Sequence, residues 1–213
     1  PSEALISYKH LARYRQFIPN IVVAIRCKKA LKAEPHYPRI DGEGITVAPI
    51  PDPQTPLKAL LCLPKIIKAI IKAINSADRY YLKLPEPTAT LVGLLLLALR
   101  KKYAVEVVAD SKKGILFAKK KMPFVRFYAS FFDGVTMFLV KRAWCATYVS
   151  EYLRKRYPTR SKDREWVFCS AELSDDLGGL PKSVEHFKNR PFRIFSAGRM
   201  SAEKGHIYLV RAF

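Results

Sequence analysis

Two cations and two glycines lie close together near the end of the chain, where a phosphate-binding turn would place them. They belong to the string SAGRMSAEKG, residues 196–205, which follows the apolar segment 192–195. Arg199 and Lys204 supply positive charge, and Gly198 and Gly205 let the backbone approach a ligand. The pattern predicts a strand, a glycine turn and a helix, an arrangement that holds phosphate groups in α/β proteins. The chemistry it favours is the binding of a phosphate group.

This string and the helical YLVRAF segment at 208–213 resemble the opening of the nucleotide-sugar domain in retaining family 4 glycosyltransferases of the GT-B fold. The resemblance is specific only at residues 194–205, and the earlier chain matches by the order of its elements. It implies that Arg199 and Lys204 hold the donor diphosphate, with Gly198 and Gly205 beside it. It also implies sugar transfer with retention to a glycan or lipid-linked acceptor, in cell-envelope polysaccharide synthesis, with no metal or other cofactor required.

Two carboxylates are candidates for the acceptor side. Asp110 follows an apolar-rich strand, at the edge where open α/β sheets bind ligands, so it is predicted to position an acceptor hydroxyl or act as a base. It would equally serve as a cap for the next helix. Glu86 stands between two prolines at a neighbouring strand end and is a weaker candidate for acceptor contact. Glu203 is better explained as a carboxylate that interacts with the dipole of a helix N-terminus than as a catalytic residue. The resemblance implies that the leaving phosphate takes the acceptor proton, so that no protein base is strictly needed.

The chain departs from the family pattern in three ways. The first strand and its glycine-rich loop, expected before residue 2, are missing; a His-Asp pair appears as Ala109-Asp110; and the E-x7-E element would lie beyond Phe213. We therefore expect a sequence truncated at both ends, inactive by itself. A missing central strand would leave both of its neighbours with unpaired edges.

The elements that must position these residues alternate between strands and helices. Strands are expected at 21–27, 45–50, 79–84, 103–109, 146–150 and 165–169, and helices at 2–17, 57–74, 88–100, 113–141 and 150–157. Pro64 is expected to kink or restart the second of these helices, and Ser150 to cap the last one. This order predicts an α/β fold with a doubly wound parallel sheet, Rossmann-like. We expect an acceptor-side domain at 1–169, a linker at 170–190, and the start of a donor-binding domain at 191–213.

Composition restricts the partners. The formal charge is +20, and residues 100–164 carry 17 basic against 5 acidic side chains. Such an excess suits a nucleotide, a nucleic acid or an anionic membrane. The aromatic-rich 119–128 segment keeps a nucleic-acid-binding module open as an alternative. The basic segments 57–74 and 112–121 likewise leave open a non-catalytic peripheral membrane protein, although packing of 57–74 on a sheet is favoured.

The cysteines and histidines do not point to a metal site. Four scattered cysteines, with no C-x-x-C and no histidine at zinc-ligand spacing, favour free thiols in a reducing cytoplasm. We expect a cytoplasmic protein, at the inner face of the plasma membrane if lysines 112–121 bind anionic lipid. The longest apolar run, 91–99, has about half the length of a membrane span.

Overall fold

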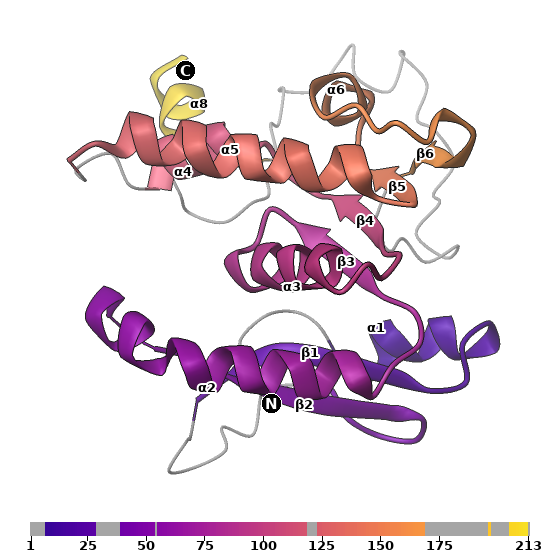
Figure 1. Ribbon diagram of the computed structural model, residues 1–213. Coiled ribbons are helices and arrows are strands. Elements are labelled where there is room, and N and C mark those ends of the chain that lie inside the picture. Colours follow the sequence, from indigo (N-terminus) through magenta and orange to yellow (C-terminus); the bar gives the residue numbers. More distant parts are fainter. Residues whose placement is uncertain are drawn as a thin grey trace.

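The chain has an α/β fold, and every pairing between the strands of its described residues is parallel. The computed structural model describes residues 7–28, 39–53, 55–118, 123–168, 196 and 205–212 (Figure 1). Its strands form a two-stranded sheet, ordered β1-β2, and a four-stranded sheet, ordered β3-β4-β5-β6. Their bounds are β1 Ile21–Cys27, β2 Ile45–Pro51, β3 Tyr81–Leu84, β4 Ala104–Val107, β5 Cys145–Tyr148 and β6 Glu165–Val167. The predicted α/β class with parallel strands is confirmed.

Helices alternate with these strands. They are α1 Tyr8–Ala12, the 3-10 turn η1 Arg13–Gln16, α2 Pro56–Asn75, α3 Pro87–Ala98, α4 Ser111–Ala118, α5 Val125–Arg142, α6 Glu151–Arg156, the 3-10 turn η2 Lys162–Arg164 and α8 His206–Ala212. Local chemistry explains where three of them begin. Thr55, Glu86 and Ser150 each accept a hydrogen bond from a backbone N–H of the first turn. Proline occupies the first helical position of both α2 and α3, where its missing N–H costs nothing.

Two helix predictions differ from the structure. The single helix expected over 113–141 is two helices, α4 and α5, and Phe124, with a φ of 57°, changes the chain direction just before α5. A left-handed residue cannot continue a right-handed helix, so α5 cannot extend back through Phe124. Pro64 was expected to kink or restart the second helix, but α2 continues as one helix through it.

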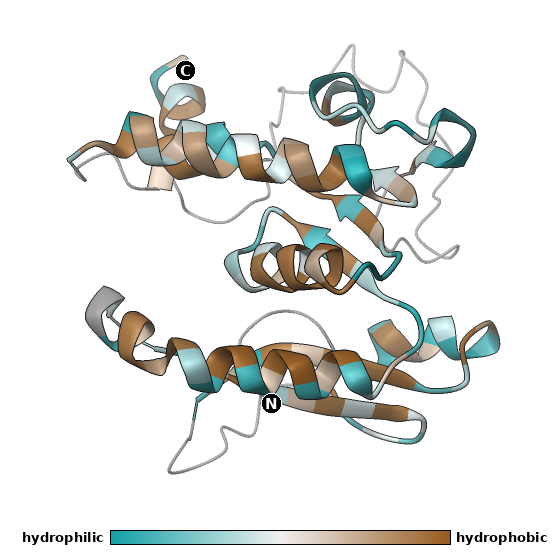
Figure 2. Ribbon diagram, in the orientation of Figure 1, coloured by the Kyte–Doolittle hydropathy of each residue, from teal (hydrophilic) through white to brown (hydrophobic). Residues whose placement is uncertain are grey.

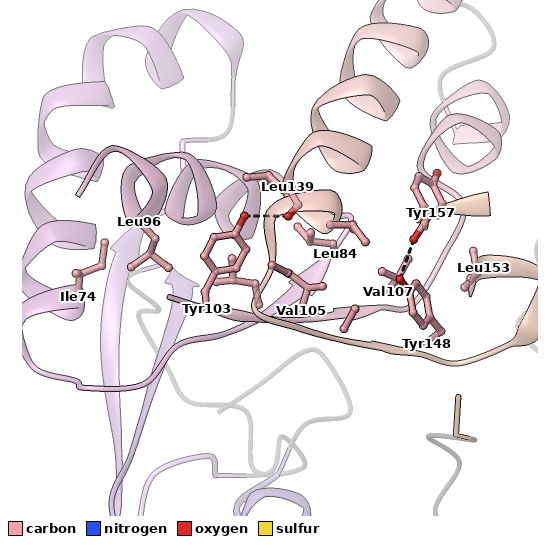
Figure 3. Packing of buried hydrophobic residues seen from close by; sticks show 14 of the residues in the cluster. Ile74, Leu84, Leu96, Tyr103, Val105, Val107, Leu139, Tyr148, Leu153 and Tyr157 are labelled. Carbon is pink, nitrogen blue, oxygen red and sulfur yellow. Dashed lines mark hydrogen bonds between the residues drawn. The ribbon is translucent and has the colours of Figure 1, made fainter. Parts of the chain in front are cut away.

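One apolar core joins both sheets. Ile50 of β2 and Ile70 and Ile74 of α2 belong to the same buried cluster as the inward residues of β3, β4 and β5. Figure 2 shows α3 as mostly hydrophobic, and Figure 3 shows Ile74 in the cluster. Two of the three tyrosines labelled in this core donate to backbone carbonyls: Tyr103 to that of Leu139 at 2.9 Å, and Tyr148 to that of Tyr157 at 2.8 Å (Figure 3). Buried hydroxyls without partners would be costly, so these bonds help fix the packing.

A glycine allows α3 to lie close to the sheet and to α5. A Cβ on Gly93 would come within 3.1 Å of the side chain of Leu139 on α5 and 3.2 Å of Leu82 on β3. The close approach lets the almost wholly apolar α3 fill one face of the four-stranded sheet. The layer thus formed sets the positions of the loops that follow β3 and β4.

The sheet has an interruption that bears on the expected domain. No described strand is hydrogen-bonded to the outer edge of β3, and the β1–β2 pair forms a sheet of its own. The expected linker, 170–190, and the expected strand at 192–195 lie outside the described residues.

Candidate functional site

The carboxyl ends of neighbouring strands bring three polar side chains to one edge of the four-stranded sheet. Glu86 follows β3, Asp110 follows β4 and Ser150 follows β5. All three cap the helix that comes next: Glu86 accepts from the N–H of Ala89 at 2.8 Å, Asp110 from Lys113 at 2.9 Å and Ser150 from Leu153 at 3.4 Å. The two predicted carboxylates therefore share a sheet edge, but each already has a structural role there.

Asp110 is held as a carboxylate. Its Oδ2 accepts a 2.7 Å hydrogen bond from the hydroxyl of Tyr152, and Nε of Arg156 lies 3.9 Å away. Burial alone would raise the pKa of Asp110, but the Lys113 N–H, the Tyr152 hydroxyl and the charge of Arg156 outweigh it and lower the pKa below its usual value. A carboxylate with a lowered pKa is a poor proton acceptor at neutral pH. The geometry suits positioning of a hydroxyl better than general-base catalysis.

A buried ion pair lies behind Asp110. Asp133 of α5 is 6% exposed and accepts hydrogen bonds of 2.5 Å from both Arg156 Nη2 and the Tyr157 hydroxyl. The Tyr157 hydroxyl also accepts from the N–H of Ser111, at 2.9 Å. Burial first, and then the bond to Asp133, raise the pKa of Tyr157 above its usual value, so Tyr157 stays a donor. Arg156 thus lies between two carboxylates and fixes the start of α4 relative to α5 and α6.

Sequence reasoning missed this network. The signal was present, because Asp133 is the lone acidic residue in the apolar, aromatic stretch 125–140. An ionised carboxylate is rarely buried unless it is paired, so its position on the packed side of a helix required a cationic partner. The partner, however, comes from a different helix, and spacing along the chain could not identify it.

A second buried acid was also missed. Glu106, in the middle of β4, is 2% exposed. Its Oε2 lies 3.1 Å from the Lys83 ammonium and accepts a 3.0 Å hydrogen bond from the Tyr81 hydroxyl. Both partners come from β3, so Glu106 sits on the sheet face opposite the apolar core formed by Val105 and Val107. An acid within an apolar strand was the available signal.

Glu86 has a partner across the sheet interruption. Arg26, near the end of β1, places Nη2 3.2 Å from Glu86 Oε1, while its Nη1 lies 3.5 Å from Asp52. The carboxyl ends of β1 and β3 therefore lie at the same side of the molecule. This ion pair leaves Glu86 less available to a ligand than its place in the sequence suggested.

The predicted diphosphate turn lies mostly beyond the described part of the chain. Gly198, Arg199, Glu203 and Lys204 fall outside the described residues. Gly205 is described: its φ is 72°, in the left-handed region, and α8 begins at the next residue. The glycine turn and the helix after it are thus formed at this end of the string.

Among the described side chains, no group of three or more histidine, cysteine, aspartate or glutamate residues is arranged to hold a metal ion. Cys27, Cys62 and Cys145 are free thiols, and burial raises the pKa of the Cys145 thiol. A low-pKa thiol is what a nucleophilic cysteine requires, and Cys145 lacks that property.

Comparison with known proteins gave no match to any family model, any curated protein or any solved structure. The glycosyltransferase resemblance therefore rests on residues 194–205 and on the order of the elements before them. Within the described residues, none of the helices combines the length and the apolar character needed to cross a lipid bilayer.

Proposed function

We propose that this chain is the acceptor-side part, with the beginning of the donor-binding part, of a retaining GT-B glycosyltransferase. The observation that carries the proposal is the string at 196–205, with its two cations between two glycines. The parallel sheet before it and the left-handed Gly205 at the start of α8 are compatible with that reading. The substrate class is a nucleotide-sugar donor with a glycan or lipid-linked acceptor.

The proposed roles follow from the chemistry of sugar transfer. Negative charge accumulates on the departing diphosphate, and the bidentate fork of Arg199 and the ammonium of Lys204 would stabilise it. Gly198 and Gly205 would let backbone N–H groups approach the same phosphates. Asp110, an ionised acceptor of hydrogen bonds, would orient the acceptor hydroxyl, with Glu86 nearby at the same sheet edge. The proposed location is the cytoplasm.

The test is donor binding and transfer by variants of the two cations. Because this chain is expected to be inactive by itself, both measurements use the full-length parent enzyme. There Arg199→Ala is expected to weaken binding of nucleoside-diphosphate sugars in calorimetry, and to lower kcat/KM by about 10²-fold, because one charge-stabilising donor contributes about 3 kcal/mol. Arg211→Ala is the matched control, since Arg211 is exposed in the last turn of α8. Activity of Arg199→Ala within about threefold of the unsubstituted protein would contradict the assignment.

A further inference from the structure

The long helix α2 has three distinct sides. Its packed side carries Ile70 and Ile74, both fully buried in the core. A second side is apolar yet open to solvent: Leu60 is 67% exposed, and Leu63 and Ile71, which lie near it at about 3.6 residues per turn, are exposed as well. Exposed single leucines are ordinary on protein surfaces, but a row of them along one helix side is a feature that needs a partner.

The third side of α2 is a lysine row. Lys58, Lys65 and Lys72 recur every seven residues, so they lie nearly in line along the helix, and all three are exposed. Leu61 and Lys68, both exposed, lie between this row and the apolar one. Residues 56–75 contain no acidic side chain. None of the four lysines forms an ion pair with another described residue, so no described carboxylate compensates their charge.

The apolar row is also hollowed. A shallow depression of about 460 Å³ runs along it, lined by Leu63, Pro64, Ile67, Lys68 and Ile71. Pro64 presents no N–H and a flat apolar ring there. Figure 1 shows α2 along one border of the molecule, with β1 and β2, so the open sides of the helix are accessible from solvent.

We propose that α2 docks on the surface of an anionic phospholipid membrane. The apolar row, which includes Leu60, Leu63 and Ile71, enters the boundary between headgroups and acyl chains, and the lysine row beside it contacts the lipid phosphates. An apolar side next to a basic side is what an interfacial helix requires. A nucleic acid would use the lysines but would leave the leucines in water. The proposal stands apart from the transfer chemistry and concerns a different surface.

The earlier candidate for lipid binding, lysines 112–121, is weaker among the described residues. Lys113 places its ammonium 4.5 Å from the centre of the Tyr152 ring, beside Asp110, and Lys112 is half-buried. These two cations are already engaged with the fold or partly covered by it. The lysines of α2 have neither feature, so α2 is the surface to test.

The experiment is sedimentation of the full 213-residue chain with lipid vesicles. Binding to vesicles of phosphatidylglycerol and phosphatidylcholine is expected at low salt, with little binding to phosphatidylcholine alone. Three variants separate the contributions: Lys58→Gln/Lys65→Gln/Lys72→Gln, Leu60→Ser/Leu63→Ser, and a control of equal charge change, Lys102→Gln/Lys141→Gln/Lys155→Gln. All these side chains are exposed, so the fold should be retained, and circular dichroism checks it.

Each outcome decides the matter. The lysine variant should bind anionic vesicles at least about tenfold more weakly, and the control within about threefold of the parent. The leucine variant should also lose about tenfold, and whatever binding is left should disappear at high salt. Equal loss in the control, or equal binding to both kinds of vesicle, would overturn the proposal. So would a leucine variant that binds like the parent, and duplex DNA bound through the α2 lysines would then be the better description.

Discussion

The four-stranded sheet and the β1–β2 pair are built from similar parallel strands, yet they differ sharply in burial. Val105 and Val107 of β4 and Tyr148 of β5 are fully buried beneath α3 and α5. No residue of β1 reaches that state, and β2 has only Ile45 and Ile50. A parallel sheet is stable when its faces are covered, and this difference shows which part of the molecule supplies most of the stability.

The interactions between the two regions also differ from those within each region. Within each sheet, backbone ladders connect the strands, but no such ladder is described between β3 and the β1–β2 pair. The backbone carbonyls of Tyr80 and Leu84 accept hydrogen bonds from the N–H groups of Ala104 and Val108, on the side of β4. Because backbone groups alternate along a strand, those of Tyr81 and Lys83 point to the opposite edge of β3, toward no described strand. Side chains must therefore hold the regions together: the shared apolar cluster and the Arg26–Glu86 ion pair.

The largest expected effect is a cavity in the four-stranded sheet. Leu84→Ala should lower the free energy of unfolding by about 3 kcal/mol, because Leu84 is fully buried between β4 and the helices. The matched change in the other region, Val22→Ala in half-buried β1, should cost about 1 kcal/mol. Urea unfolding followed by circular dichroism measures both. Equal losses of unfolding free energy in the two variants would mean that the two regions contribute equally to stability.

The next effect concerns the buried ion pair. Asp133→Ala leaves the Arg156 cation and the Tyr157 hydroxyl without their acceptor, and Arg156 is partly solvated, so about 2 kcal/mol of stability should be lost. Asp163→Ala, at an exposed ion pair with Arg164, should change stability by less than about 0.5 kcal/mol. If thermal unfolding gives the same midpoint for both variants, the network has no structural role.

The tyrosines make the four-stranded region sensitive to alkali. Burial raises the pKa of Tyr103 to about 12, with Arg142 acting in the opposite direction, and burial also raises the pKa of Tyr148. A folded-state pKa above the ordinary 10.0 means that the stabilisation is complete below pH 10 and is lost as the pH rises toward 12. Stability should fall in that interval, and Tyr103→Phe should make the fall shallower. The same slope in the variant would exclude Tyr103 as a cause.

The elements could be predicted from sequence far better than their pairing. Apolar runs closed by proline, glycine or a capping residue located every strand of the described chain, and Ser150 was correctly expected to cap a helix. The placement of Asp110 and Glu86 at strand ends followed from the same signals. The interaction partners of Asp133 and Glu106 could not be predicted, because each lies on another element and pairing depends on tertiary packing. The start of α5 follows a left-handed residue, Phe124, whose conformation sequence propensity does not favour.

The smallest expected effect tests the link between the regions directly. Arg26 and Glu86 are 48% and 37% exposed, so their ion pair should contribute about 0.5 kcal/mol and weaken in salt. Glu86→Gln keeps an oxygen to cap α3 while removing the charge, and Arg26→Gln removes the other partner. Because Arg26 also lies 3.5 Å from Asp52, only the coupling energy of the double-mutant cycle isolates the Glu86 contact.

A coupling of about 0.5 kcal/mol at low salt that vanishes in high salt is expected. A coupling of zero at low salt would show that the apolar cluster alone joins the β1–β2 pair to the four-stranded sheet, and Leu82→Ala, at the β3 side of that cluster, would then be the change that separates their unfolding.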